Sequence, residues 1–394
     1  MEDLVHVNVN RALNSIACVI ALIAFIATGE PVMLFMLLVV VSFVLLAGPF
    51  TRFAVHRARL SFDIKPSCPV GRELALEISL KRPALLRGNI ELVFELRNLC
   101  LGTTERVPVS LAPAQGAVER YSLPVGTGAV GRISVEIVSA RAVDVFGFSY
   151  ATMPSVVYAA SYTVYPRVDD LTVTADRASR MALTGLVFDK YRKGQDLSEV
   201  FELRDYREGD SLKAVHWKLS ARTDELMVRE ASHPADFDLA LFLGIHGGSS
   251  DAARIAQTNA AFSILASLSR AFVHRALGHT VVHRNGRELE AESVDTELGF
   301  NGMLDELLSC RLPEDVVGDA RSFAIFQRAH GISKLVIVTD VIREALFSEF
   351  SALCDLTVIY IGGEGGVTVD ESVEYLLIRI STDAVNSRIK SLEL

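Results

Sequence analysis

The sequence predicts a multidomain protein with an N-terminal transmembrane α-hairpin, an antiparallel β-sandwich and a C-terminal α/β domain with a Rossmann-like sheet. Three observations predict this architecture. Two uncharged apolar stretches open the chain, polar and apolar residues then alternate, and strand-like apolar runs finally alternate with helix-length segments. The 394 residues are enough for roughly two or three compact units.

The first predicted element is a helical hairpin in residues 1–56. The runs Ala12–Gly29 and Pro31–Phe50 contain no charged residue and no histidine, and each is long enough to cross the bilayer core. Only Glu30 is charged between them, so the connection is predicted to be a tight turn. A signal peptide is the alternative for the first run, because Arg11 precedes it. The second run follows at once and favours the hairpin.

Basic residues predict the orientation of this hairpin. Arg11 precedes it, the turn has no basic residue, and four basic residues follow it: Arg52, Arg57, Arg59 and Lys65. We therefore expect a two-pass protein of the cell membrane, with the lipid bilayer as a partner and the remaining domains in the cytoplasm. The five cysteines show no paired or metal-ligand spacing, which fits a reducing compartment.

A β-sandwich is predicted for residues 57–168. Leu74, Leu76, Ile78 and Leu80 alternate with polar or small residues, which is the period of a half-buried strand. Turn residues such as Gly71 separate these runs. No catalytic group of residues stands out in this region.

An α/β domain is predicted for residues 235–394. The predicted strands are Phe237–Ile245, Lys334–Thr339, Leu356–Ile361 and Tyr375–Ile380, and the predicted helices are Asp251–Ala276 and Arg343–Cys354. Alternation of this kind predicts a largely parallel sheet covered by helices.

The most distinctive stretch lies between these domains, in the segment 169–234. Gly209 permits a turn, and Asp210 is placed to cap a short helix from Ser211 to about Leu219. Trp217 lies on that helix outside its apolar face, and we expect its side chain to be buried. Residues 203–230 contain equal numbers of acidic and basic side chains, which is more typical of an internal network or a docking surface than of a phosphate site.

Two other functions of this stretch are weighed against the docking surface. Catalysis by His216 with Asp210 or Asp205 lacks a serine, cysteine or metal-ligand set to complete a mechanism. Nucleic-acid binding around Trp217 is disfavoured by the balanced local charge and by a net charge of −9. We expect no nucleic-acid partner.

At these residues the chain resembles the domain of unknown function 58 family of bacterial membrane-associated proteins. The resemblance rests on Arg204, Asp205, Tyr206, Gly209, Asp210, His216, Trp217, Lys218, Ser220, Arg222, Arg229 and Glu230. Asp144–Gly147 and Val164–Arg167 also match, although Val145 stands where the family usually has proline. The resemblance implies a von Willebrand A-like C-terminal domain and an association with MoxR-type AAA+ ATPases, often also with transglutaminase-like membrane proteins.

The implied fold raises the question of a metal site. Von Willebrand A domains often bind Mg²⁺ through Asp-x-Ser-x-Ser after the first strand, since this ion prefers oxygen ligands. Gly244, His246 and Gly248 occupy the three ligand positions here, and Asp340 after the later strand is the remaining carboxylate. This degenerate set predicts that the protein binds no metal or cofactor.

Together these features favour a non-enzymatic, membrane-tethered scaffold or adaptor. We expect it to work with a MoxR-type AAA+ ATPase in the assembly or maturation of a membrane or cell-envelope client. The alternative is a hydrolase or phosphotransfer enzyme that uses the charged cluster at 204–230.

Overall fold

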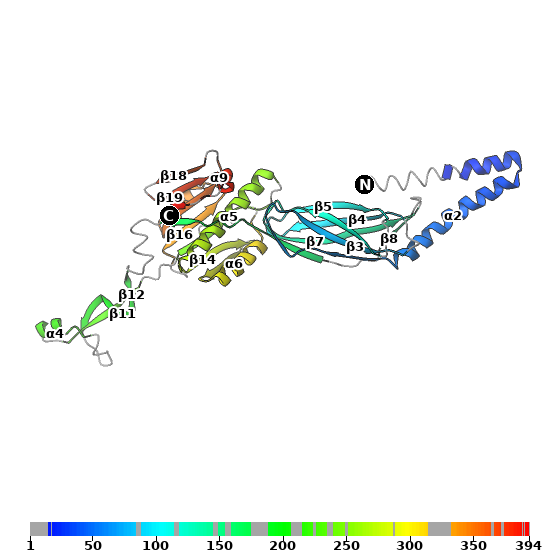
Figure 1. Cartoon of the computed structure of the whole chain (residues 1–394). Helices are drawn as coiled ribbons and strands as arrows, with labels where there is room; N and C mark the ends of the chain where they lie inside the picture. Colours follow the sequence, from blue (N-terminus) through cyan, green and yellow to red (C-terminus); the bar gives the residue numbers. More distant parts are fainter. Residues whose placement is uncertain are drawn as a thin grey trace. The chain divides into compact units, whose positions relative to one another are not determined.

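The computed structural model divides the chain into two compact units, Met1–Tyr165 and Pro166–Leu394 (Figure 1). The structure describes residues 15–16, 18–83, 88–113, 118–144, 149–153, 159–174, 188–205, 215–223, 226–234, 239–248, 251–286, 288–313, 332–363, 366–371, 374–387, 389 and 391–393. Each unit has its own sheets and its own core.

Two β-sheets build the first unit and pack on one shared core. The three-stranded sheet has the order β1 (Arg59–Asp63), β3 (Leu74–Lys81), β6 (Glu119–Val125). The second sheet has the order β2 (Ser67–Pro69), β9 (Ala159–Tyr165), β7 (Gly131–Val143), β4 (Ile90–Asn98), β5 (Thr104–Leu111), with β8 (Tyr150–Thr152) beside β7. Neighbouring strands run antiparallel except for the β2–β9 pair. Buried residues from both sheets, among them Leu76, Phe94 and Val135, form one apolar cluster.

Period-two burial explains why these segments are strands. Along β3 the residues alternate between buried and more exposed, so Leu74, Leu76, Ile78 and Leu80 face the core. This alternation matches the pattern predicted from the sequence.

Helix α2 (Pro31–Val55) precedes the sandwich and begins with a proline in its first turn, where the missing N–H costs nothing. Its earlier turns expose large apolar side chains, among them Phe35 and Leu45. Its last turn instead packs on the sandwich: Ala54 and Val55 are buried in the core, and the Thr51 hydroxyl lies 3.2 Å from that of Ser149.

The predicted membrane anchor needs correction. Across the part of the chain that the structure describes, no helix combines the length and the apolar character required to cross a bilayer. On this finding the predicted transmembrane hairpin is wrong, and so is the two-pass membrane localisation. The sequence pattern showed only that the segment is apolar, whereas the structure packs the end of α2 against the sandwich.

A seven-stranded sheet forms the centre of the second unit. Its strands are β13 (Leu239–Gly244), β14 (His279–Asn285), β15 (Glu288–Val294), β16 (Lys334–Thr339), β17 (Asp355–Ile361), β18 (Val367–Glu371) and β19 (Leu376–Ile380). They lie in the order β15-β14-β13-β16-β17-β19-β18. The interior pairings are parallel and only the edge strands β15 and β18 are antiparallel, so the predicted largely parallel sheet is confirmed.

Helices α5 (Ala252–His274), α6 (Glu297–Ser309), α8 (Glu344–Ser351) and α9 (Thr382–Asn386) accompany this sheet. The longest, α5, packs on β13, β14, β16 and β17, and most of its second half is buried. A short parallel pair, β10 (Thr172–Thr174) with β20 (Ser391–Glu393), joins the beginning of the unit to its end.

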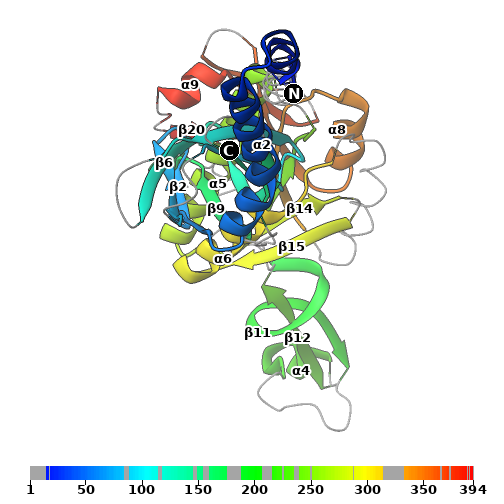
Figure 2. The same cartoon turned by 90° about the vertical axis from the view of Figure 1, so that its right-hand side faces the viewer.

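The distinctive segment forms a sheet of its own. β11 (Phe188–Asp205) and β12 (Met227–Pro234) pair antiparallel, and α4 (Trp217–Thr223) packs on β12 (Figures 1 and 2). The helix predicted from Ser211 begins later, at Trp217, because Val215 is held in a β-bridge with Val228. The predicted capping residue, Asp210, lies outside the described residues.

Candidate functional site at the carboxyl edge of the parallel sheet

The strand order of the second unit identifies a candidate site. After β13 the chain continues to β14 on one side, whereas β16 lies on the other side, so the direction of winding reverses between β13 and β16. In open α/β sheets, ligands bind outside the carboxyl ends of the strands at such a switch point. Gly244 and Thr339, the last residues of these two strands, are aligned in register.

Three polar side chains meet beyond these strand ends. His246 follows β13, Asp340 follows β16, and Arg254 lies in the first turn of α5. The Nδ1 atom of His246 is 2.8 Å from one carboxylate oxygen of Asp340, and a guanidinium nitrogen of Arg254 is 3.0 Å from the other. The backbone N–H of His246 also points at the second oxygen, at 3.4 Å.

The electrostatics of this cluster follow from its burial. The Asp340 side chain is 3% exposed, and a buried carboxylate is stable only with compensating charge and hydrogen bonds. Arg254, whose side chain is 34% exposed, supplies the charge and keeps partial contact with water. Because the carboxylate only accepts, the His246 ring donates from Nδ1.

The predicted degenerate metal set can now be tested against geometry. The structure brings His246 and Asp340 together, but Arg254 contacts the carboxylate oxygen that a divalent ion would need. Gly248 has a φ of 81°, a left-handed conformation that suits glycine and would strain a serine. Within the described ranges no group of three or more His, Cys, Asp or Glu side chains is placed to hold a metal. The residues present do not fit a Mg²⁺ site.

A small apolar hollow lies beside the cluster. Its walls include Phe242, Ile337, Phe347 and Phe350, with His246 at one side. Its volume of about 20 Å³ is little more than a single water needs. A pocket for a small-molecule substrate usually measures roughly 300–1,000 Å³. Among the described side chains, this hollow leaves no room for a small-molecule substrate.

Arg254 is not among the residues predicted from the sequence, although its position in the first turn of a helix is unusual for a cation. The positive end of the helix dipole lies at the first turn, so a cation there is unfavourable without a nearby anion. An arginine three residues after the N-cap Asp251 is such a misfit, and Asp340 is the anion that resolves it.

The hairpin of β11 and β12 contains the residues of the family resemblance, and the structure describes only some of them. Arg204 and Asp205 end β11 and are paired in register with Val228 and Met227 of β12. Tyr206, Gly209 and Asp210 lie outside the described residues, as do the side chains of Trp217, Arg229 and Glu230. The expected burial of Trp217 therefore stays a prediction. Lys218 and Arg222 are exposed on α4.

His216 and Ser220 join α4 to β12. The N–H of Leu219 is shared between the carbonyl oxygen of His216, at 2.9 Å, and its Nδ1 atom, at 3.2 Å. The Ser220 hydroxyl, which is buried, accepts from the N–H of Met227 at 2.8 Å and donates to the His216 carbonyl at 3.2 Å. The His216 side chain thus satisfies a backbone N–H at the start of α4, and the Ser220 hydroxyl links the helix to β12, so both have a structural use.

The fold and the site define the second unit as a doubly wound α/β domain with an internal ion pair at its switch point. Residues 202–283 match the family described as "Protein of unknown function DUF58". This match covers part of the hairpin and the first strands of the parallel sheet, and it supports the resemblance to that family. No curated protein matches the chain.

Solved structures resemble the chain only distantly. A cohesin module from a family 33 glycoside hydrolase of Clostridium perfringens ATCC13124 is 12% identical, with a TM-score of 0.18, over 27% of this chain and 96% of its own. A cycloisomaltooligosaccharide glucanotransferase of a Paenibacillus species is 10% identical, with a TM-score of 0.16, over 77% of this chain and 45% of its own. A beta-glucuronidase of Bacteroides uniformis is 9% identical, with a TM-score of 0.15, over 78% and 36%.

Proposed function

We propose that this protein is a non-enzymatic adaptor that engages a MoxR-type AAA+ ATPase and transmits its action to a client protein. The proposal rests on the fold of the hairpin that β11, α4 and β12 form, which contains the residues of the family resemblance. It builds its own two-stranded sheet with a short helix, and it does not join the seven-stranded sheet. A module of this kind can dock on a partner without disturbing the main sheet. The partner class is the one that the resemblance to the domain of unknown function 58 family implies, and residues 202–283 match that family.

The parallel sheet supports the same proposal. We infer a von Willebrand A-like domain, since six of its strands in the order β15-β14-β13-β16-β17-β19 wind in both directions from β13. Its carboxyl edge is occupied by the His246–Asp340–Arg254 cluster and by a hollow too small for a substrate. Protein binding is the use that this edge supports best.

The side chains that the structure describes in the hairpin do not favour the hydrolase or phosphotransfer alternative. The Nδ1 atom of His216 accepts from a backbone N–H, and the Ser220 hydroxyl is hydrogen-bonded to Met227 and to His216. A general base and a nucleophile need these atoms for substrate.

The exposed cations of α4 provide the test. Lys218 and Arg222 are four residues apart and therefore lie on one face of the helix. We expect the immobilised full chain to capture a purified MoxR-type ATPase from the same source, and the double variant Lys218→Glu, Arg222→Glu to lose capture by about tenfold or more. Arg275→Glu, an exposed cation elsewhere in the second unit, is the matched control and should capture normally. Wild-type protein that captures no ATPase would refute the partnership.

A further inference from the structure

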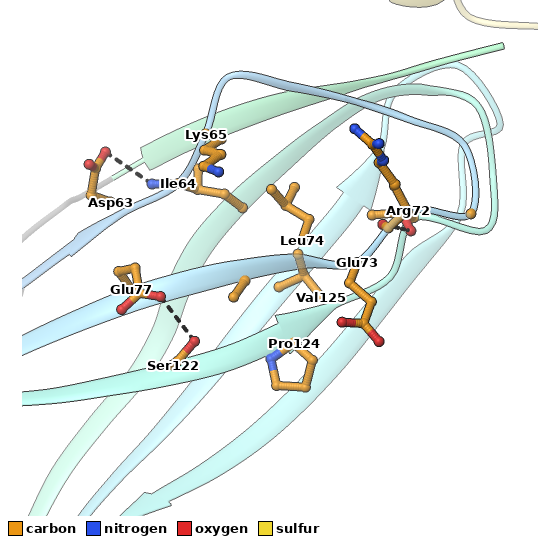
Figure 3. A pocket seen from close by; sticks show the side chains of 13 residues that line it. Asp63, Ile64, Lys65, Arg72, Glu73, Leu74, Glu77, Ser122, Pro124 and Val125 are labelled. Atoms are coloured by element: carbon orange, nitrogen blue, oxygen red, sulfur yellow. Dashed lines mark hydrogen bonds between the residues drawn. The ribbon is translucent and has the colours of Figure 1, made fainter. Parts of the chain in front are cut away.

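The first unit contains an open hollow that the proposed function does not use. It measures about 780 Å³ and lies beside the start of β3 (Figure 3). One wall is the segment after β1, with Ile64 and Lys65, and the other includes Leu74, Ala75 and Glu77 of β3.

The hollow exists because the chain changes sheets at this point. β1 pairs with β3 as far as Asp63 opposite Glu77. The Pro66 carbonyl then accepts from the N–H of Thr163 at 2.9 Å, and β2 joins the other sheet. Among the described strands none continues β1 beside residues 74–76 of β3.

Pro124 determines where the backbone of Ala75 points. Ala75 is aligned with Pro124 of β6, which has no N–H to donate. Proline in an edge strand occupies a position that does not hydrogen-bond to its neighbour. In an antiparallel pair both partners of such a position direct their N–H and C=O groups away from each other. The N–H and C=O of Ala75 therefore point to the opposite edge, into the hollow.

The side chains around this edge specify what an added strand would carry. Leu74 and Leu76 face the core, so residues opposite them would also point inward and should be apolar. A residue opposite Ala75 would point outward, with Glu73 and Glu77 as its diagonal neighbours. The hollow is lined by the carboxylates Asp63, Glu73 and Glu77 against the cations Lys65 and Arg72, which favours a basic residue at that position.

We propose that this notch, the hollow beside the start of β3, binds an extended segment of a partner protein as an additional strand. The added strand runs antiparallel to β3, as β1 does, with a lysine or arginine opposite Ala75 between two apolar residues. Main-chain hydrogen bonds to Ala75 supply affinity, and the alternating side chains supply specificity. This binding mode is independent of the ATPase partnership, since it uses only the first unit.

Three labelled peptides test the proposal on the full chain. The probe is acetyl-Thr-Val-Lys-Val-Thr-amide with a fluorophore, the second peptide carries a methyl group on the backbone nitrogen of its lysine, and the third has glutamate in place of lysine. We expect fluorescence anisotropy to show binding of the probe. Methylation should weaken it at least about fivefold, because it removes the donor to the Ala75 carbonyl. Glutamate should weaken it about three- to tenfold.

Protein variants locate the site. Ala75→Pro removes the N–H that faces the hollow and should weaken the probe at least about fivefold, while Glu73→Gln should weaken it about two- to fivefold. Amide exchange of residues 73–77 should slow when the probe is added. Equal binding of the methylated peptide, or no binding of the probe, would overturn the proposal. Amide exchange at Ala75 that slows when only the protein concentration is raised would mean that a second copy of the chain occupies the notch. That result would also overturn the proposal.

Discussion

The two strand-end regions of this protein differ in how their polar groups are satisfied. At the carboxyl edge of the seven-stranded sheet, Asp340 is paired with His246 and Arg254, and a hollow of about 20 Å³ remains. Beside β3 of the first unit, a strand ends early and leaves a hollow of about 780 Å³ next to the outward-facing backbone of Ala75.

Because of this difference, mutations should affect the folding stability of one region and the binding of a partner at the other. A buried ion pair contributes little net stability but becomes costly once one partner is removed. The backbone groups of an open strand edge form hydrogen bonds with water. A mutation there costs little stability and changes only which strand can pair with the edge. The closed site should therefore respond to mutation in its folding, and the open site in its binding.

The largest effect is expected at the closed site. Arg254→Met leaves the carboxylate of Asp340, which is 3% exposed, with His246 alone. We expect a loss of about 3 kcal/mol in the free energy of unfolding, below the upper end for buried pairs because the Arg254 side chain is partly exposed. Urea denaturation of the second unit measures it.

The matched double variant decides whether charge is the cause. Adding Asp340→Asn to Arg254→Met removes the stranded charge and should recover more than half of the lost free energy. If the two losses simply add, packing rather than ion pairing explains the effect of Arg254.

The second prediction compares two positions of β3 that lie on the same edge. Ser79 is paired with Ser61 of β1, whereas Ala75 has passed the end of β1. Ser79→Pro should cost about 2–3 kcal/mol because it removes a ladder donor, and Ala75→Pro should cost less than about 1 kcal/mol. Thermal unfolding of the first unit distinguishes them. Equal losses would show that the backbone of Ala75 is not free at this edge.

The third prediction concerns the pH dependence of the stability of the second unit. Burial lowers the pKa of His279 and of His283 below the ordinary 6.5, so each takes up its proton at a lower pH in the folded state than in the unfolded chain. As the pH falls below about 6.5, the unfolded chain binds protons that the folded chain does not, and stability decreases. The slope is at most about 1.4 kcal/mol per pH unit for each histidine.

We expect the second unit to lose about 2 kcal/mol between pH 7.5 and 5.5, as measured by denaturation at each pH. His279→Asn should flatten this dependence by about half, since asparagine cannot take up the proton.

The smallest effect is expected in the signature hairpin. Ser220→Ala removes the acceptor for the Met227 N–H and should cost about 1 kcal/mol, confined to α4 and β12. Faster amide exchange at Met227 measures it, and Ser220→Thr, which keeps the hydroxyl, is the control. Unchanged exchange in the alanine variant would show that the hydroxyl does not hold α4 on β12.

The parallel sheet could be predicted in part from the sequence. Lys334–Thr339 was predicted to its boundaries, and the helix of residues 252–274 to within two residues, because both are long uninterrupted apolar or periodic runs. Strand β14 was missed, since it contains His279, His283 and Arg284. These polar residues are buried by neighbouring elements, which local pattern cannot reveal.

The candidate sites were less predictable. His246 and Asp340 were identified as a pair of positions, but Arg254 was not, because its partner lies 86 residues further along the chain. The transmembrane prediction failed for a related reason: an apolar run measures composition, and the structure places the end of α2 in a protein core. The notch beside β3 had no sequence signal, since it arises where the chain leaves one sheet for another.

The sequence alone determined the local periodicities, the likeness of residues 204–230 to a known family, and the loss of the carboxylate and hydroxyl ligands at Gly244, His246 and Gly248. These depend on residue type and spacing, which are properties of the chain itself. Only the tertiary structure decided that Arg254 neutralises Asp340 and that Ala75 faces an open edge. Both depend on which distant segments become neighbours, and that is decided by the packing of whole sheets and helices.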